Sequence, residues 1–130
     1  MQFIPIVSLL LLSWYSSVSG TCFTTGPTWG DANQRKILDD NIENLCRQMT
    51  GKFAVGAAAS RCLKGGEKPG NRYDFLFRNV NKEERTLTME TCTRLIRKDI
   101  ATCPMGAYNQ GSNWWYTSDP NEGECLTTGP

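Results

Sequence analysis

The sequence predicts a small α+β domain that is crosslinked by disulfides. Two segments, residues 31–50 and 88–103, carry apolar side chains at the spacing of a helix. Two others, residues 53–59 and 72–80, alternate in the manner of strands. The six cysteines, an even number, all follow an apolar N-terminal segment.

That N-terminal segment is predicted to be a signal peptide. An apolar stretch runs from Phe3 to Trp14, and small residues follow it up to Gly20. The stretch is shorter than the ~20 residues that a membrane-spanning helix needs. We therefore expect residues 1–20 to be removed and residues 21–130 to form one secreted, extracellular domain. In such a chain the cysteines are expected to form three disulfides among Cys22, Cys46, Cys62, Cys92, Cys103 and Cys125.

The first predicted helix has clear signals at both ends. Asp31 is a good N-cap, Gln34 completes a capping box three residues later, and Gly51 ends the helix. Cys46 lies beside the apolar face, where a disulfide would attach the helix to the layer that it covers. The apolar positions are Leu38, Ile42, Leu45 and Met49.

The middle of the chain is predicted to form three strands. Residues 53–59 alternate, although their alanine-rich end could also be helical. A loop is expected at residues 65–70, rich in glycine, and a short strand around residues 85–87. Residues 72–80 give the strongest strand pattern. One face of that strand would carry Tyr73, Phe75 and Phe77.

Thr88 is expected to cap the second helix, which Pro104 and Gly106 would end. Along a continuous helix Cys92 and Cys103 would lie ~16 Å apart, so they cannot bond to each other. The sequence leaves the remaining pairings open. The inner face of this helix would carry Cys92, Leu95, Ile96 and Ile100.

Aromatic and polar side chains are concentrated in residues 107–118, before a predicted turn at residues 119–123. Sugar rings stack their apolar faces on Trp and Tyr, and their hydroxyl and N-acetyl groups need polar partners, so this mixture suits saccharide binding. The alternative is that these rings belong to the core. Strand alternation places Trp114 and Tyr116 on one face and Trp115 on the other, and we assign Trp115 to the ligand.

The composition argues against several other functions. The chain has no histidine, which removes Ser-His-Asp and Cys-His catalysis and the common zinc sites. It has no phosphate-binding glycine motif. The net charge is +1, and we interpret Arg94, Arg97 and Lys98 as a solvated helix face near its C-terminus. We therefore expect no metal, no cofactor and no nucleic-acid partner.

Two rival functions remain open at the level of residues. A small glycoside hydrolase would use Asp119 with Glu122 or Glu124, provided that the carboxylates converge ~5–9 Å apart. Otherwise Asp119 organises the turn and the glutamates face water. A toxin or effector acting on a protein or membrane would instead show a contiguous apolar or basic patch.

The C-terminal motif Asp119-Pro-Asn-Glu-Gly-Glu-Cys125 follows a Trp/Tyr strand. With the order of the cysteines, it resembles a family of small secreted fungal proteins that includes glycan-binding antiviral lectins. The similarity extends over nearly all of residues 21–130. The other matching positions are Cys22, Trp29, Cys46, Gly51, Phe53, Cys62, Arg72, Asp74, Phe75, Cys92 and Cys103.

The resemblance implies an αβα sandwich, in which helices flank an antiparallel sheet. It also implies a homodimer, in which the sheets of the two copies join edge to edge and the glycan pocket reaches the dimer interface. It implies a lectin that has no enzymatic activity and binds N-acetylhexosamine-containing glycans, including fucosylated ones. Such a lectin would have a defence, antiviral or cytotoxic role. Its partners would be glycans or glycoproteins. The binding residues that we predict are Tyr108, Asn109, Asn113, Trp115, Tyr116, Arg72, Tyr73 and Asp74.

Overall fold

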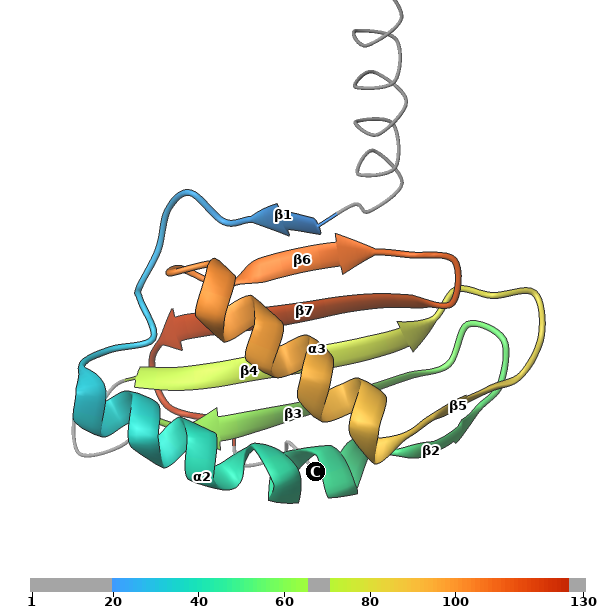
Figure 1. Ribbon diagram of the computed structural model, residues 1–130, viewed down its shortest axis with the longest axis horizontal. Helices are drawn as coiled ribbons and strands as arrows, with labels where there is room; N and C mark the ends of the chain where they lie inside the picture. The colour runs from blue at the N-terminus through green and yellow to red at the C-terminus, as the bar shows by residue number, and fades with distance from the viewer. Residues whose placement is uncertain (1–19, 66–70, 127–130) are drawn as a thin grey trace, which may run out of the picture.

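A five-stranded antiparallel sheet forms the centre of the domain (Figure 1). The computed structural model describes residues 20–65 and 71–126, so nearly all of the predicted signal peptide and of the expected loop lie outside the described residues. The strand order is β1 (Gly20–Cys22), β6 (Ala107–Gln110), β7 (Trp114–Glu122), β4 (Asn71–Asn79) and β3 (Ala58–Lys64). A separate antiparallel pair consists of β2 (Gly51–Phe53) and β5 (Arg85–Leu87).

Two helices, α2 (Ala32–Met49) and α3 (Met89–Thr102), lie in front of the sheet in Figure 1 and cover one face of it. Both were predicted, and the predicted caps are present. In α2 the Asp31 carboxylate accepts a hydrogen bond from the Gln34 amide at 2.9 Å, and the Gln34 side chain accepts one from the Asp31 amide at 3.0 Å. In α3 the Thr88 hydroxyl accepts from the Thr91 amide at 3.2 Å.

The core lies between the helices and the sheet face that they cover. Trp29, which precedes α2, is fully buried; its indole N–H donates to the carbonyl of Cys103 at 2.8 Å. Tyr73 and Phe75 of β4 pack against the Trp29 ring at 5.6 and 6.2 Å between centroids. The predicted inner face of residues 72–80 is confirmed, since Tyr73, Phe75 and Phe77 are all buried.

Three disulfides are present, as predicted. They join Cys22 to Cys103, Cys46 to Cys92 and Cys62 to Cys125. The Cys46–Cys92 bond links α2 to α3 inside the helical layer, because both cysteines lie on the buried faces of their helices. As expected, Cys92 and Cys103 are not bonded to each other.

The α+β class, the antiparallel sheet and the disulfides are thus confirmed, whereas the layering differs from the αβα sandwich that the resemblance implied. The two helices pack on the same face, held side by side by the Cys46–Cys92 bond and by a shared apolar core. Within residues 20–65 and 71–126, no helix covers the other face of the sheet. The described part of a single copy therefore has two layers and leaves one sheet face uncovered by helices.

Two local predictions are wrong for identifiable reasons. The expected strand over residues 53–59 is interrupted by a turn, in which the Ala57 amide donates to the Ala54 carbonyl at 3.0 Å, and Gly56 has a φ of +79°. The expected turn at residues 119–123 is instead the end of β7. Pairing of β7 with β6 stops at Ser118, so Pro120, which has no N–H, lies where only β4 is a neighbour.

In the part of the chain that the structure describes, no helix has the length and apolarity required to span a membrane.

Candidate functional site

The sheet face opposite the helices carries a mixed set of polar and apolar side chains, which we call the open face. Because side chains alternate along a strand, it receives every second residue of the two longest strands. Tyr108 of β6 lies beside Thr117, which in turn lies beside Leu76. The open face comprises Arg72, Asp74, Leu76, Arg78, Tyr108, Trp115, Thr117, Asp119 and Asn121.

The apolar part of the open face is a row across three strands with an indole next to it. Tyr108 is 41% exposed, and its ring contacts the Phe23 ring at 5.6 Å between centroids. Trp115 is half-buried and lies opposite Arg78 in the strand register. Aromatic surface of this kind can stack on the C–H face of a sugar ring while neighbouring polar groups bind its hydroxyls.

The polar part of the open face is a network around Asp74. Arg72 donates from Nε to Oδ2 of Asp74 at 2.8 Å, and Nδ2 of Asn121 donates to the same oxygen at 2.7 Å. Asn121 Nδ2 also contacts Oδ2 of Asp119 at 3.1 Å. Asp74 and Asp119 are direct partners across β4 and β7. The network fixes two neighbouring carboxylates, whose oxygens are hydrogen-bond acceptors for a ligand.

The two carboxylates do not have the same environment. Burial raises the pKa of Asp119 above its ordinary 3.8, and the charge of Asp74 acts in the same direction, while the hydrogen bond from Asn121 and the charge of Arg72 oppose them. Asp119 therefore takes up a proton at a higher pH than a solvated aspartate does.

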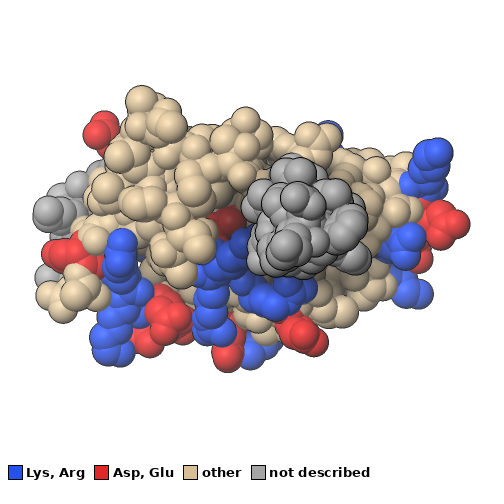
Figure 2. All heavy atoms as spheres, turned by 45° about the horizontal axis from the view of Figure 1, so that its top comes forward, with Lys and Arg blue, Asp and Glu red and all other residues tan. Residues whose placement is uncertain are grey.

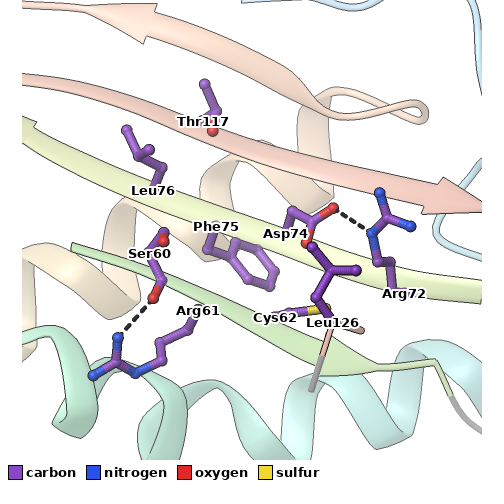
Figure 3. A pocket seen from close by; sticks show the side chains of 9 residues that line it. All are labelled: Ser60, Arg61, Cys62, Arg72, Asp74, Phe75, Leu76, Thr117 and Leu126. Carbon is purple, nitrogen blue, oxygen red and sulfur yellow. Dashed lines mark hydrogen bonds and ion pairs between the residues drawn. The ribbon is translucent and has the colours of Figure 1, made fainter. Parts of the chain in front are cut away.

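A pocket of about 310 Å³ lies next to this network, between β4, β3 and the segment after β7 (Figure 3). This volume is at the lower limit for small-ligand pockets, ~300 Å³. In Figure 3 Leu126 lies near Asp74 and Cys62, and Cys125, the residue before it, is bonded to Cys62. The lining residues are Ser60, Arg61, Cys62, Arg72, Asp74, Phe75, Leu76, Thr117 and Leu126.

Four of the predicted binding residues lie together on the open face: Arg72, Asp74, Tyr108 and Trp115. A fifth, Asn113, is exposed in the loop between β6 and β7, at the end of the sheet. Its Oδ1 accepts a hydrogen bond from Asn81 at 2.8 Å.

The other three point into the core and are removed from the candidate site. Tyr73 is 2% exposed and donates its hydroxyl hydrogen to the Trp29 carbonyl. Asn109 donates to both oxygens of buried Asp99 at 3.1 Å, and Tyr116 stacks on Phe77 at 5.3 Å. Each of the three is adjacent in sequence to an open-face residue, so strand alternation turns its side chain to the opposite face.

Sequence reasoning also missed members of the open face. The predicted binding residues did not include Leu76, Thr117 or Asn121. Each of these lies an even number of positions along its strand from a predicted binding residue, and therefore on the same face. Taking every second residue along each strand, starting from Trp115 and from Asp74, would have found them.

A further buried group lies under the sheet and was not predicted. Asp99 of α3 is 2% exposed, and it accepts hydrogen bonds from Asn109 and, at 2.7 Å, from Oγ of Ser118. Burial raises the pKa of Asp99, while these hydrogen bonds oppose that shift. The contact attaches α3 to the inner face of β6 and β7, directly behind the open face.

The carboxylate pair of the hydrolase hypothesis does not form as predicted. Asp119 lies on the open face, but Glu122 is three residues along the same strand, an odd separation that turns it to the opposite side. Glu124 is exposed and lies beyond the end of β7. The carboxylate that faces Asp119 is Asp74 instead.

Charge is distributed without a large surface of one sign in the view of Figure 2. Positive and negative side chains are interspersed along the lower side, whereas the upper side carries few charged residues. In residues 20–65 and 71–126 there is no group of three or more His, Cys, Asp or Glu residues that could hold a metal ion.

Comparison with known protein families gives a match. The sequence model of the family described as glycan binding domain Y3 matches residues 39–125. That span contains every residue of the open face and five of the six cysteines. None of the curated proteins matches the sequence.

Proposed function

Because the chain belongs to the glycan binding domain Y3 family, we propose that it is a secreted lectin whose binding site is the open face of the sheet. Family membership supports glycan binding as its role and suggests a protein without enzymatic activity. One observation carries the placement of the site. An apolar row and the Trp115 indole lie next to the fixed carboxylates of Asp74 and Asp119, on a sheet face that no described helix covers. The row consists of Leu76, Thr117 and Tyr108.

The ligand class that we propose is N-acetylhexosamine-containing glycans, including fucosylated ones. An N-acetyl group has an apolar methyl and an amide N–H that needs an acceptor. The pocket beside Asp74 offers both environments, since Leu76 and Leu126 line it together with the Asp74 carboxylate. The faces of neighbouring sugar rings would then lie along Thr117, Tyr108 and Trp115.

Secretion, a fungal source and a defence, antiviral or cytotoxic role are parts of the same proposal. Three disulfides are consistent with an extracellular protein, because such bonds persist in oxidising compartments. Glycans or glycoproteins on other cells or viruses would be the partners.

We also propose that two copies form a homodimer through a sheet edge. The edges of the five-stranded sheet are β1 and β3, and exposed edges tend to pair or to be protected. Of these, β3 is the longer, with seven residues against three. It also contributes Ser60 and Cys62 to the pocket, so pairing through β3 would bring that pocket to the interface.

A glycan-array screen of the mature protein tests the proposal, with binding to N-acetylhexosamine-containing glycans as the expected result. The best ligand is then titrated into the wild type and into Trp115→Ala. We expect affinity to fall at least about tenfold, equivalent to ~1.4 kcal/mol. Arg97→Ala, a substitution on the outer surface of α3, serves as the matched control and should bind like the wild type. A folded Trp115→Ala protein with full affinity would exclude the open face.

A second candidate function has one observation in its favour. Asp74 and Asp119 are neighbouring carboxylates, and the raised pKa of Asp119 is what a general acid needs. Incubation with N-acetylglucosamine oligosaccharides, followed by mass spectrometry, separates the two functions. A lectin leaves the oligosaccharides intact, whereas cleavage that Asp119→Asn abolishes would identify a hydrolase.

A further inference from the structure

A second pocket lies at one end of the domain, between β5, the start of α3 and the loop that joins β6 to β7. Figure 1 shows β5 and that loop at the same end of the sheet. The pocket has a volume of about 490 Å³. Trp114 and Tyr116 line it from the covered side of the sheet, so it is separate from the open face. Neither Asp nor Glu contributes to its lining. The polar lining residues are Arg85, Thr86, Thr91, Arg94, Ser112 and Asn113.

The two arginines bring positive charge that their surroundings do not neutralise. Arg94 is exposed, and among the described residues it forms no ion pair and no hydrogen bond. Arg85 has a buried Nε without a hydrogen-bond partner. Its Nη2 donates to Oδ1 of Asn81 at 3.3 Å and lies 3.8 Å from a carboxylate oxygen of Glu83. The Glu83 side chain is 78% exposed, so that ion pair is long and solvated.

The rest of the lining supplies hydrogen-bond donors. Asn81 donates to Oδ1 of Asn113 at 2.8 Å, which orients the Asn113 side chain and leaves its amide nitrogen to donate. Ser112 adds an exposed hydroxyl. Burial and the charge of Asp99 raise the pKa of Tyr116 from 10.0 to about 12, so its phenol keeps its proton even at alkaline pH where a solvated tyrosine ionises. The first turn of α3 includes Thr91, and a helix N-terminus favours negative charge.

We infer that this pocket binds the carboxylate or sulfate group of an acidic saccharide. An arginine binds such a group through two parallel hydrogen bonds, and the exposed guanidinium of Arg94 is available for them. The adjacent hydroxyl, amide and aromatic groups suit the sugar that carries the anion. This inference rests on the proposed function only in taking the ligand to be a glycan; the site itself is a different one.

The test compares a sialic acid methyl glycoside and N-acetylglucosamine 6-sulfate with neutral N-acetylglucosamine, by NMR titration of the mature protein. The acidic sugars should shift the backbone resonances of Ser112 and Asn113 and the indole N–H of Trp114. Their affinity should fall at least about tenfold in Arg94→Gln. It should also fall as the ionic strength is raised from about 0.05 to about 0.5 M, because salt screens exposed charges.

Arg97→Gln is the matched control, because it removes the same charge three residues further along α3 and outside the pocket. It should leave the affinity for acidic sugars unchanged. Equal affinity in Arg94→Gln and the wild type, or shifts confined to the open face, would overturn the inference. So would binding of inorganic sulfate as tight as that of the sulfated sugar, because the pocket would then recognise only the ion. Neutral-glycan binding in Arg94→Gln reports separately on the proposed function.

Discussion

Trp114 and Trp115 are consecutive in β7, yet their side chains lie on opposite faces of the sheet. Trp114 is 9% exposed and meets Phe53 edge to face, with 5.0 Å between ring centroids and 84° between ring planes. Trp115 is half-buried on the open face, next to Thr117 and Arg78. Strand alternation alone produces this division: the Trp114 indole packs in the core, and the Trp115 indole is left for the ligand contact that we propose.

The two tryptophans should therefore respond differently to truncation. Trp114→Ala removes a ring from the core and should lower the free energy of unfolding by ~3–5 kcal/mol. Trp115→Ala should unfold near the wild-type denaturant midpoint but lose glycan binding. Urea unfolding followed by circular dichroism, together with a glycan titration, measures both effects. Equal destabilisation by the two variants would contradict the division.

Asp99 should make stability depend on pH with a defined sign. Burial raises the pKa of its carboxyl above 3.8 in the folded protein, so the folded state holds this proton more tightly than the unfolded chain does. The buried charge then costs stability above the raised pKa, and the cost disappears as the pH falls toward 3.8. The stability of the wild type relative to Asp99→Asn should therefore rise as the pH is lowered through this window.

Asn109→Ala provides a second test of the Asp99 site. It removes two hydrogen bonds that oppose the shift in the pKa of Asp99, so the upper end of the pH window should rise while its lower end stays at the pKa of the unfolded chain. Chemical denaturation of the three proteins at a series of pH values gives the curves. Parallel curves for the wild type and Asp99→Asn would show that the carboxyl has the same proton affinity in both states.

The disulfides should separate stability from binding. The Cys46–Cys92 bond joins the two helices over a sequence separation of 46 residues, and the double alanine variant should lose roughly 2–5 kcal/mol of stability. Its glycan affinity should stay unchanged, because the bond lies on the covered side. Removing the Cys62–Cys125 bond should weaken glycan binding, since Leu126 is then no longer held beside the pocket. Equal binding losses in the two variants would contradict this separation.

The proposed dimer predicts a mass of about twice that of one mature chain. Light scattering at micromolar concentration measures it, and hydrogen exchange locates the interface. Backbone amides of β3 should exchange more slowly in the dimer, because the edge strand gains hydrogen-bond partners. A monomer at this concentration, or slowed exchange confined to β1, would remove the β3 interface.

Much of the fold could be predicted because its signals are local. The capping box of Asp31 and Gln34, the Thr88 cap and the alternation of Tyr73, Phe75 and Phe77 each depend on residues close in sequence. The layering could not be predicted in the same way. Placing both helices on one face rests on the shared apolar core and on contacts such as that of Cys46 with Cys92, which are far apart in the chain.

The candidate site shows the same limit. Composition drew attention to the segment around Trp115, and alternation already placed Tyr116 on the face of Trp114. The predicted binding residues nevertheless kept Tyr116 and also Asn109 of β6, and both side chains are buried. The predicted turn at Asp119 was also wrong. After Ser118, β7 is no longer paired with β6, so a proline without an N–H can stand at position 120 of the strand. The sequence alone does not show where the pairing of β6 with β7 ends.

An NMR titration of the mature protein with an N-acetylglucosamine disaccharide shows where on the molecule a glycan binds. If glycans bind on the open face, as we propose, the shifts will cluster on Leu76, Tyr108, Trp115 and Thr117 and at the Asp74 network, while the outer surfaces of α2 and α3 stay unchanged. Shifts on the helices without any on these strands would contradict the proposal, as would saturable binding that leaves the indole N–H of Trp115 unmoved.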